Sequence, residues 1–258
     1  MKRNWLQRVG RWTVSVSLAA ALAACASAGQ NGQAEGDDND PIELVNRNVF
    51  AVNQTVDMVA IRPVAQTYKE WAPEPVKTGV RNFLNYLRTP VNLANDLLQA
   101  DGKRAGTTIS RFAMNTMTLG FGDIAKDNGL PYQRNDFGAT LYRWGLGEGP
   151  YIVLPIAGPS NARDAVGLGV DVLLDPLNWV FAGSGDIDTA MTWGRYGTNG
   201  VDVRARTIDP LDDVEKGALD FYATVRSLSR QIRSEELKGI RGDKPPSPSL
   251  TMRTSTAP

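Results

Sequence analysis

Hydrophobic residues recur along residues 42–59 with the spacing of an α-helix. Successive members lie three or four positions apart: Ile42, Val45, Val49, Val52, Val56 and Val59. Because residues three and four apart share one helix face, the spacing predicts an amphipathic helix with an apolar stripe. Asp40 as N-cap, Pro41 at the first helical position and Glu43 at the third mark its start. The opposite face is polar, with Asn46, Arg47, Asn53 and Asp57, but Phe50 lies off the stripe, so apolar surface is expected on more than one side.

Prolines mark the starts of further helices. Four dipeptides place a proline where a first helical turn tolerates a missing N–H: Arg62-Pro63, Glu74-Pro75, Thr89-Pro90 and Asp209-Pro210. We expect a helix after each of them. After the last, apolar residues again alternate by three and four across residues 210–237, which predicts one continuous helix about 42 Å long. Such a helix either packs in a core or binds a partner.

The middle of the chain is rich in glycine. Residues 102–200 hold 17 of the 25 glycines. Glycine disfavours helices by about 1 kcal/mol per residue in soluble proteins. In membrane proteins it permits close helix approach and irregular backbone around a cavity, and this second setting suits the segment better. The apolar run 151–158 is broken by Pro155 and is too short to span a bilayer, which leaves a buried strand or a loop that dips into lipid.

The first 24 residues have the layout of a secretory signal peptide. Lys2, Arg3, Arg8 and Arg11 precede a short uncharged run, which is shorter than the roughly 20 apolar residues that a spanning helix needs. The only cysteine, Cys25, follows "LAA", and this stretch resembles the lipobox of bacterial lipoproteins, in which the cysteine carries a diacylglyceryl thioether. A buried core cysteine is the alternative. Ala26 in place of aspartate resembles the sorting signal for the outer membrane.

Composition divides the mature chain into three parts. Residues 25–39 are small and polar, as a flexible tether requires. Residues 40–238 form the single folded body. Residues 239–258 contain proline, serine and threonine without periodicity, and we expect them to be disordered.

The residue content excludes several classes of chemistry. Removal of the signal segment leaves a formal net charge of −4, so a nucleic-acid binder is not expected. The absence of histidine removes the base of Ser-His-Asp and Cys-His sites and the usual ligands of zinc. Neither an SxxK tetrad nor a phosphate-loop or dinucleotide fingerprint occurs. Adjacent carboxylates such as Asp212 and Asp213 would diverge on a helix, and the acidic "DDND" lacks the spacing of a calcium loop. We therefore expect no catalytic residue, no metal, no cofactor and no enzymatic activity.

Several segments occur in an order that is typical of one protein family: "NDPIELVNRNVFAVNQTVD", "RPVAQTYKEWAPEPVKTGVRNFLNYL", "NDLLQ", "RFAMNT", "GDIA" and "DFGATLYRWGLGEGPYIVLPIAGPSNARDAVG". Together they resemble the MlaA (VacJ) outer-membrane lipoproteins over residues 40–178, and more loosely through the final long helix. The segment "LPIAGPSNARD" is the most distinctive. Tyr86 departs from the family, which often has a second asparagine there, and the C-terminal tail has no counterpart.

The resemblance implies an all-α protein, in which amphipathic helices lie in the outer membrane as a ring around a small central channel, with a long C-terminal helix. It implies binding to trimeric porins. It also implies removal of mislocalised phospholipid from the outer leaflet and its transfer to a soluble periplasmic carrier, MlaC, which maintains lipid asymmetry. The protein would be lipid-anchored in the outer membrane and face the periplasm.

The resemblance also suggests roles for individual residues. Cys25 would be the lipid anchor. The first-helix motif would hold that helix against the ring and set how open the channel rests, or it would supply capping and core hydrogen bonds: Asn46, Arg47, Phe50 and Asn53. The "GPY..LP..G" stretch would form the channel rim or a lipid-facing loop, or an ordinary structural turn: Gly145, Gly149, Pro150, Tyr151, Leu154, Pro155 and Gly158.

Two pairs of polar residues complete the candidate set. Arg163 and Asp164 would form an ion pair near the channel, or an ordinary pair at a helix N-terminus. Arg111 and Asn115, one helical turn apart, would contact lipid phosphate, because arginine offers it a bidentate fork, or they would form an internal salt bridge.

Two other functions compete with lipid transport. A phospholipid hydrolase of the envelope would need a carboxylate site without a known motif, and it would produce lysophospholipid. A structural lipoprotein would scaffold porins or other envelope proteins through the long helix and the tail without moving lipid.

Overall fold

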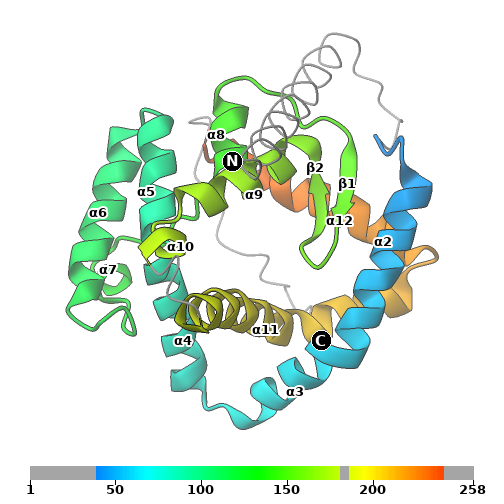
Figure 1. Cartoon of the computed structure of the whole chain (residues 1–258), viewed down its shortest axis with the longest axis horizontal. Coiled ribbons are helices and arrows are strands. Elements are labelled where there is room, and N and C mark those ends of the chain that lie inside the picture. Colours follow the sequence, from blue (N-terminus) through cyan, green and yellow to red (C-terminus); the bar gives the residue numbers. More distant parts are fainter. Residues whose placement is uncertain (1–38, 181–185, 241–258) are drawn as a thin grey trace, which may run out of the picture.

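The computed structural model describes residues 39–180 and 186–240 of the chain. The signal segment, Cys25 and nearly all of the tether and tail lie outside these residues. Apart from one two-stranded hairpin, the regular elements are helical, which confirms the predicted all-α fold. Figure 1 shows the elements following one another around a ring, with α12 returning toward α2.

The helices and strands of the body have the following bounds in chain order. α2 (Glu43–Val56) continues through a π-helical segment, η2 (Asp57–Ile61), into α3 (Arg62–Trp71). Then follow α4 (Glu74–Leu87), α5 (Thr89–Leu98), α6 (Gly102–Thr116), α7 (Ile124–Asp127) and α8 (Phe137–Arg143). Strands β1 (Tyr151–Leu154) and β2 (Gly158–Asn161) precede α9 (Ala162–Leu174), α10 (Leu177–Val180), α11 (Asp186–Gly217) and α12 (Phe221–Lys238).

Prolines begin three of these helices as predicted. Pro63, Pro75 and Pro90 occupy the first turns of α3, α4 and α5. The prediction for Pro210 is wrong, because it lies inside α11 rather than at a helix start. The helix continues through it because α11 is held against α3 on both sides of the proline, where Lys69 pairs with Asp209 at 2.7 Å and Arg62 with Asp212 at 2.5 Å.

The final predicted helix is also interrupted. Instead of one helix over residues 210–237, α11 ends at Gly217 and α12 begins at Phe221. The side chain of Asp220 accepts a hydrogen bond from the backbone N–H of Ala223 at 3.1 Å and so caps the new helix. An N-cap residue has non-helical dihedral angles, so this cap outweighs the continuous apolar spacing. A long C-terminal helix, α12, is nevertheless present.

The first helix begins two residues later than its sequence signal indicates. Glu43 is its first residue, and the carboxylate of Asp40 does not cap it. That carboxylate is buried, and it accepts hydrogen bonds from Asn46 at 2.7 Å, Arg226 at 3.0 Å and the hydroxyl of Tyr222. Arg226 is also buried, and an unpaired buried charge costs several kcal/mol against about 1 kcal/mol for a helix cap.

The polarity of α2 is inverted relative to a helix of a water-soluble protein. Most of its valine stripe points outward: Val45 and Val52 are exposed by 56% and 60%, and Val59, in the following η2, by 74%. Val49 is the exception, because it packs against the cluster around Tyr151, whereas Asn46 on the opposite face is 1% exposed. The same distribution extends through the body. Among the described residues, 17 buried side chains are polar or charged and 12 are hydrophobic. The interior is therefore largely polar, and many large apolar side chains face outward.

Hydrophobic packing is confined to small clusters. Ala65 of α3 packs against Ala205 and Ile208 of α11. Tyr151 and Val153 of β1 pack against Tyr222 of α12. A third cluster joins Ala139, Leu237 and Ile240. Its last member lies in the segment that the sequence assigns to the tail, so the packed body extends at least to residue 240.

Candidate functional site

The hairpin is the centre of the candidate site. β1 and β2 pair antiparallel, with Tyr151 opposite Asn161 and Leu154 opposite Gly158. Of the two alternatives for residues 151–158, the structure shows a strand, whose Tyr151 and Val153 are buried, followed by a turn. Ile156 at the turn is 75% exposed and has a φ of 65°, and Gly158 has a φ of 82°. Only glycine adopts such a positive φ without strain, which explains the glycine at 158.

Two asparagines of α2 attach the hairpin to the first helix. The Asn46 amide donates to the carbonyl of Tyr151 at 3.0 Å and accepts from the N–H of Val153 at 2.9 Å. Three residues further along the chain, the Asn53 amide repeats the pattern with the carbonyl of Leu154 at 2.9 Å and the N–H of Ile156 at 2.8 Å. Asn46 and Asn53 are two helical turns apart, so both amides face β1 and take the place of a neighbouring strand.

The other two motif residues attach α2 to α12. The guanidinium of Arg47 bonds the carboxylate of Asp220 at 2.6 Å and lies 4.4 Å from the ring centre of Tyr222. The hydrogen bond from Arg47 lowers the pKa of Asp220 to about 2. The ring of Phe50 lies 5.6 Å from that of Phe221. The motif therefore makes core contacts and hydrogen bonds, and its role in channel opening stays a prediction.

A cavity of about 780 Å³ lies between the hairpin, α8, α9 and α12. Its walls combine apolar side chains, among them Leu146, Leu154, Leu168 and Ile232, with many charged ones. Five of the predicted rim or lipid-path residues line it: Gly145, Tyr151, Leu154, Arg163 and Asp164. The other four, which are Gly149, Pro150, Pro155 and Gly158, belong to the same hairpin region but are not among the lining residues.

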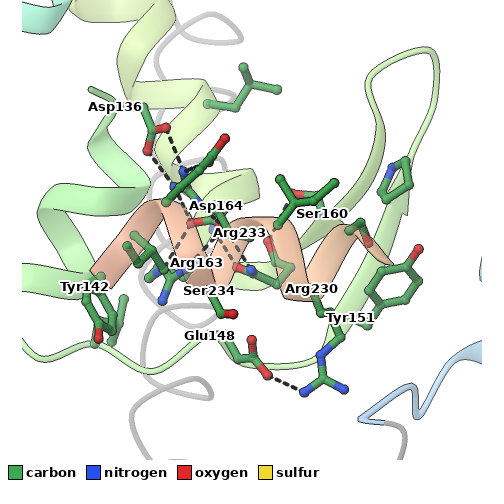
Figure 2. Close-up of a pocket in the computed structure, with 18 of the residues that line it drawn as sticks. Asp136, Tyr142, Glu148, Tyr151, Ser160, Arg163, Asp164, Arg230, Arg233 and Ser234 are labelled. Carbon is green, nitrogen blue, oxygen red and sulfur yellow. Dashed lines mark hydrogen bonds and ion pairs between the residues drawn. The ribbon is translucent and has the colours of Figure 1, made fainter. Parts of the chain in front are cut away.

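The cavity wall carries a cluster of two arginines and two aspartates, which Figure 2 shows side by side. Arg233 bonds Asp136 at 2.7 Å and Asp164 at 2.9 Å, and Arg163 bonds Asp164 at 2.9 Å. Arg163 and Asp164 thus form an ion pair in the first turn of α9, with Arg163 buried and Asp164 partly buried. Although burial alone would raise the pKa of Asp136, the guanidinium of Arg233 lowers it to about 2.

Helix α12 supplies the arginines that the sequence analysis missed. Arg226, Arg230 and Arg233 lie four and three positions apart and therefore share one face of the helix. Arg226 reaches Asp40, Arg230 pairs with Glu148 at 2.7 Å at the cavity wall, and Arg233 holds the two partly buried aspartates of the cluster. Their spacing was a usable sequence signal. Their partners come from distant segments, and only the fold brings these together.

A buried polar network lies behind the cavity. The Asn95 amide donates to Asp171 at 2.9 Å, and its oxygen accepts from the Thr140 hydroxyl at 2.8 Å. The Gln99 amide donates to both Thr140 and Asn135. Asn95 and Gln99 belong to the segment "NDLLQ", so this segment fastens α5 to α8 and α9, and it keeps the interior polar.

Helices α8 and α9 cross closely at two glycines. A Cβ atom on Gly167 would lie 2.3 Å from the backbone nitrogen of Gly138, which is closer than real Cβ atoms approach. The close helix approach expected from the glycine-rich middle is therefore present at this crossing, and it brings Asp164 toward Arg233.

The pair Arg111 and Asn115 lies outside the cavity. Both side chains bond the carboxylate of Asp123, at 2.9 and 3.0 Å, and Arg111 also donates to the carbonyl of Leu130. Of the two alternatives left open by the sequence, the structure shows the internal salt bridge. Contact with lipid phosphate stays a prediction.

Within residues 39–180 and 186–240, no helix is both long and apolar enough to cross a membrane. The same residues contain no cluster of acidic or other side chains suited to a metal ion. The proposed anchor, Cys25, lies outside the described residues.

Known proteins resemble this chain over most of its length. A family model described as MlaA lipoprotein matches residues 38–236. The chain is 33% identical over 212 residues to the "Intermembrane phospholipid transport system lipoprotein MlaA" of Shigella flexneri, with 80% of each chain covered. Identity to the protein of the same name from Escherichia coli is 32% over 212 residues, again with 80% of each covered. A chain solved in work on the "structural basis for maintenance of bacterial outer membrane lipid asymmetry" matches with a TM-score of 0.65 and 30% identity, over 77% of this chain and 98% of that one.

Proposed function

Because this chain belongs to the MlaA lipoprotein family, we propose that it removes mislocalised phospholipids from the outer leaflet of the outer membrane. It passes them through an amphipathic channel to a periplasmic lipid carrier and so maintains the lipid asymmetry of the membrane. Relatives named for intermembrane phospholipid transport support this function.

The observation that carries the proposal is the inverted polarity of the body. Large apolar side chains cover the outer faces of helices from several parts of the chain, for example Leu44, Val59, Leu173 and Val180. Exposed apolar surface on this scale is a liability in water but is stable against lipid tails. Trp71 is 81% exposed, and tryptophan prefers the boundary between lipid and water. The helices therefore lie in the membrane interface around a polar interior.

The cavity provides a surface that suits an amphipathic cargo. Leu146, Leu154, Leu168 and Ile232 offer apolar contacts to acyl chains, whereas the charged walls suit a head group. A phospholipid that passes between two membranes needs both kinds of surface at once. We assign the lipid path to this side of the ring.

Acylation of Cys25 would retain the body at the outer membrane, facing the periplasm. The diacylglyceryl group would supply two acyl chains, and the apolar outer faces of the helices would add a further attachment. The proposed partners are phospholipid, an outer-membrane porin trimer and the periplasmic carrier MlaC. The porin and the carrier are proposed from the resemblance to the family alone.

The decisive experiment measures surface-exposed phospholipid and lysophospholipid by mass spectrometry in a deletion strain. The strain is complemented with the wild type, with Cys25→Ala, or with Val52→Glu/Val59→Glu, which places two charges on the outward stripe. Ser227→Glu/Gln231→Glu is the matched control, since it adds the same charges to exposed polar positions of α12.

Transport predicts that intact phospholipid accumulates at the surface on deletion. The wild type and the α12 control restore the normal level, but Cys25→Ala and the valine variant do not. Lysophospholipid that forms only with the active protein would identify a hydrolase instead. Surface lipid that is unchanged in every strain would favour a scaffold, and full restoration by the valine variant would contradict a lipid-facing stripe.

A further inference from the structure

The arginines that line the cavity fall into two groups. Three of them hold a carboxylate oxygen at hydrogen-bond distance: Arg163 at 2.9 Å, Arg230 at 2.7 Å and Arg233 at 2.7 Å. These charges are neutralised within the protein. Arg88 and Arg134 line the same cavity without such a contact.

Arg88 has an ion-pair partner that does not satisfy the hydrogen-bond donors of its guanidinium. Its guanidinium lies 3.5 Å from Asp171, beyond the usual length of an N–H···O hydrogen bond, and its Nε is buried without an acceptor. Asp171 is already held by the Asn95 amide at 2.9 Å and by the N–H of Phe137 at 3.0 Å. Arg88 is therefore not needed to satisfy Asp171, and its own donors need an acceptor.

Arg134 is exposed on the cavity wall. Among the residues that the structure describes, no carboxylate forms an ion pair with its guanidinium, and only its backbone carbonyl is used, as an acceptor for Arg104. The nearest acid in the chain, Asp136, is occupied by Arg233. Arg88, Arg134 and Asp136 all line this cavity.

We propose that Arg88 and Arg134 bind the phosphodiester group of a phospholipid in this cavity. A guanidinium presents a planar fork of donors that matches two phosphate oxygens, and it is less strongly hydrated than an ammonium group. The apolar wall formed by Leu146, Leu154, Leu168 and Ile232 receives the acyl chains. This inference rests on the proposed function, because it names the residues that recognise the cargo along the proposed path.

The test compares two fluorescent lipids with identical acyl chains, a phosphatidylethanolamine and a diacylglycerol that lacks the phosphodiester. Their dissociation constants are measured on the full-length protein in detergent. A charge-assisted hydrogen bond contributes roughly tenfold in affinity or more. We expect the wild type to prefer the phospholipid by at least about tenfold and Arg88→Gln/Arg134→Gln to reduce this preference to within about twofold.

Lys103→Gln/Lys126→Gln is the matched control, because it removes two positive charges from exposed positions outside the cavity. It should retain the preference, and Arg88→Lys/Arg134→Lys should retain part of it. Circular dichroism melting of each variant establishes that the fold is intact. Partial recovery by lysine distinguishes loss of a phosphate contact from loss of structure.

An unchanged preference in Arg88→Gln/Arg134→Gln would overturn the inference and leave the proposed function intact. Failure of the wild type to bind either lipid would overturn both. Inorganic phosphate at millimolar concentration serves as a competitor. If it displaced the phospholipid completely, the site would bind free phosphate and the assignment to a lipid would be wrong.

Discussion

The two asparagines that hold the hairpin should differ greatly in their contribution to stability. Asn46→Ala removes the partners of the Tyr151 carbonyl and the Val153 N–H, and both of these residues are buried. Each unsatisfied backbone group costs about 1–3 kcal/mol, so the free energy of unfolding should fall by about 2–6 kcal/mol. Asn53→Ala removes the same two kinds of bond, but the Ile156 end is exposed and water replaces the amide there. The free energy of unfolding of Asn53→Ala should therefore fall by only about 1 kcal/mol.

Urea unfolding of the detergent-solubilised protein, followed by circular dichroism, gives the three free energies to compare. Asn48→Ala is the control, because the Asn48 amide bonds the Leu44 carbonyl at an exposed position of the same helix, and its effect should stay within about 0.5 kcal/mol. Amide hydrogen exchange adds a local measure. The N–H of Val153 should lose protection in Asn46→Ala and keep it in Asn53→Ala.

Equal losses for Asn46→Ala and Asn53→Ala would refute the reasoning, because both the burial of the backbone groups and the additional bond from Asn46 to Asp40 predict a larger loss for Asn46→Ala. A larger loss for Asn53→Ala would refute it more strongly. If Val153 stayed protected in Asn46→Ala, β1 would be held to the body by packing against Tyr222 rather than by the amide.

Two further predictions concern the α8–α9 crossing and the buried charges. Gly167→Ala should lower the free energy of unfolding by about 1–3 kcal/mol, because the added methyl group overlaps Gly138. Gly169→Ala has open space around it and should raise the free energy of unfolding by up to about 1 kcal/mol. Urea unfolding measures both changes. The pKa of Asp136, about 2 when folded, is below its unfolded value of about 4, so its contribution of about 2 kcal/mol is fully present above pH 4 and is lost as the pH falls through about 2. Arg233→Gln should remove this contribution at neutral pH and shift acid unfolding to higher pH, and an unchanged acid midpoint would show that another group controls it.

Local signals predicted the first four α-helices of the body. The 3,4 spacing and the three prolines at 63, 75 and 90 located α2 to α5, because helix starts depend on residues close in sequence. The errors arose where a distant contact decided the outcome. Pro210 stays inside α11 because ion pairs to α3 hold the helix on both sides, and Asp40 leaves its capping position because Arg226, far along the chain, needs an anion.

The candidate site was predictable in part. The motif residues Asn46 and Asn53 were identified through the family resemblance, and their spacing of two turns placed them on one face. Their hydrogen bonds to β1 were beyond sequence reasoning, because a strand of four residues next to glycines carries little periodic signal. Arg88 and Arg134 belong to no motif, and only the cavity geometry distinguishes them from ordinary surface arginines.

The period of a sequence predicts which residues share a helix face, but it does not tell which face is buried. For α2 the usual assumption, that the valine stripe turns inward, is wrong because the asparagine face carries groups that match the backbone of β1 and the carboxylate of Asp40. When the polar face of the helix is hydrogen-bonded inside the protein, the apolar face is exposed to the surroundings. Exposure of the apolar face is unfavourable in water and favourable against lipid. The same residues therefore make a prediction about the medium: the body should aggregate when detergent is removed, and a stable, soluble monomer in plain buffer would contradict a membrane location.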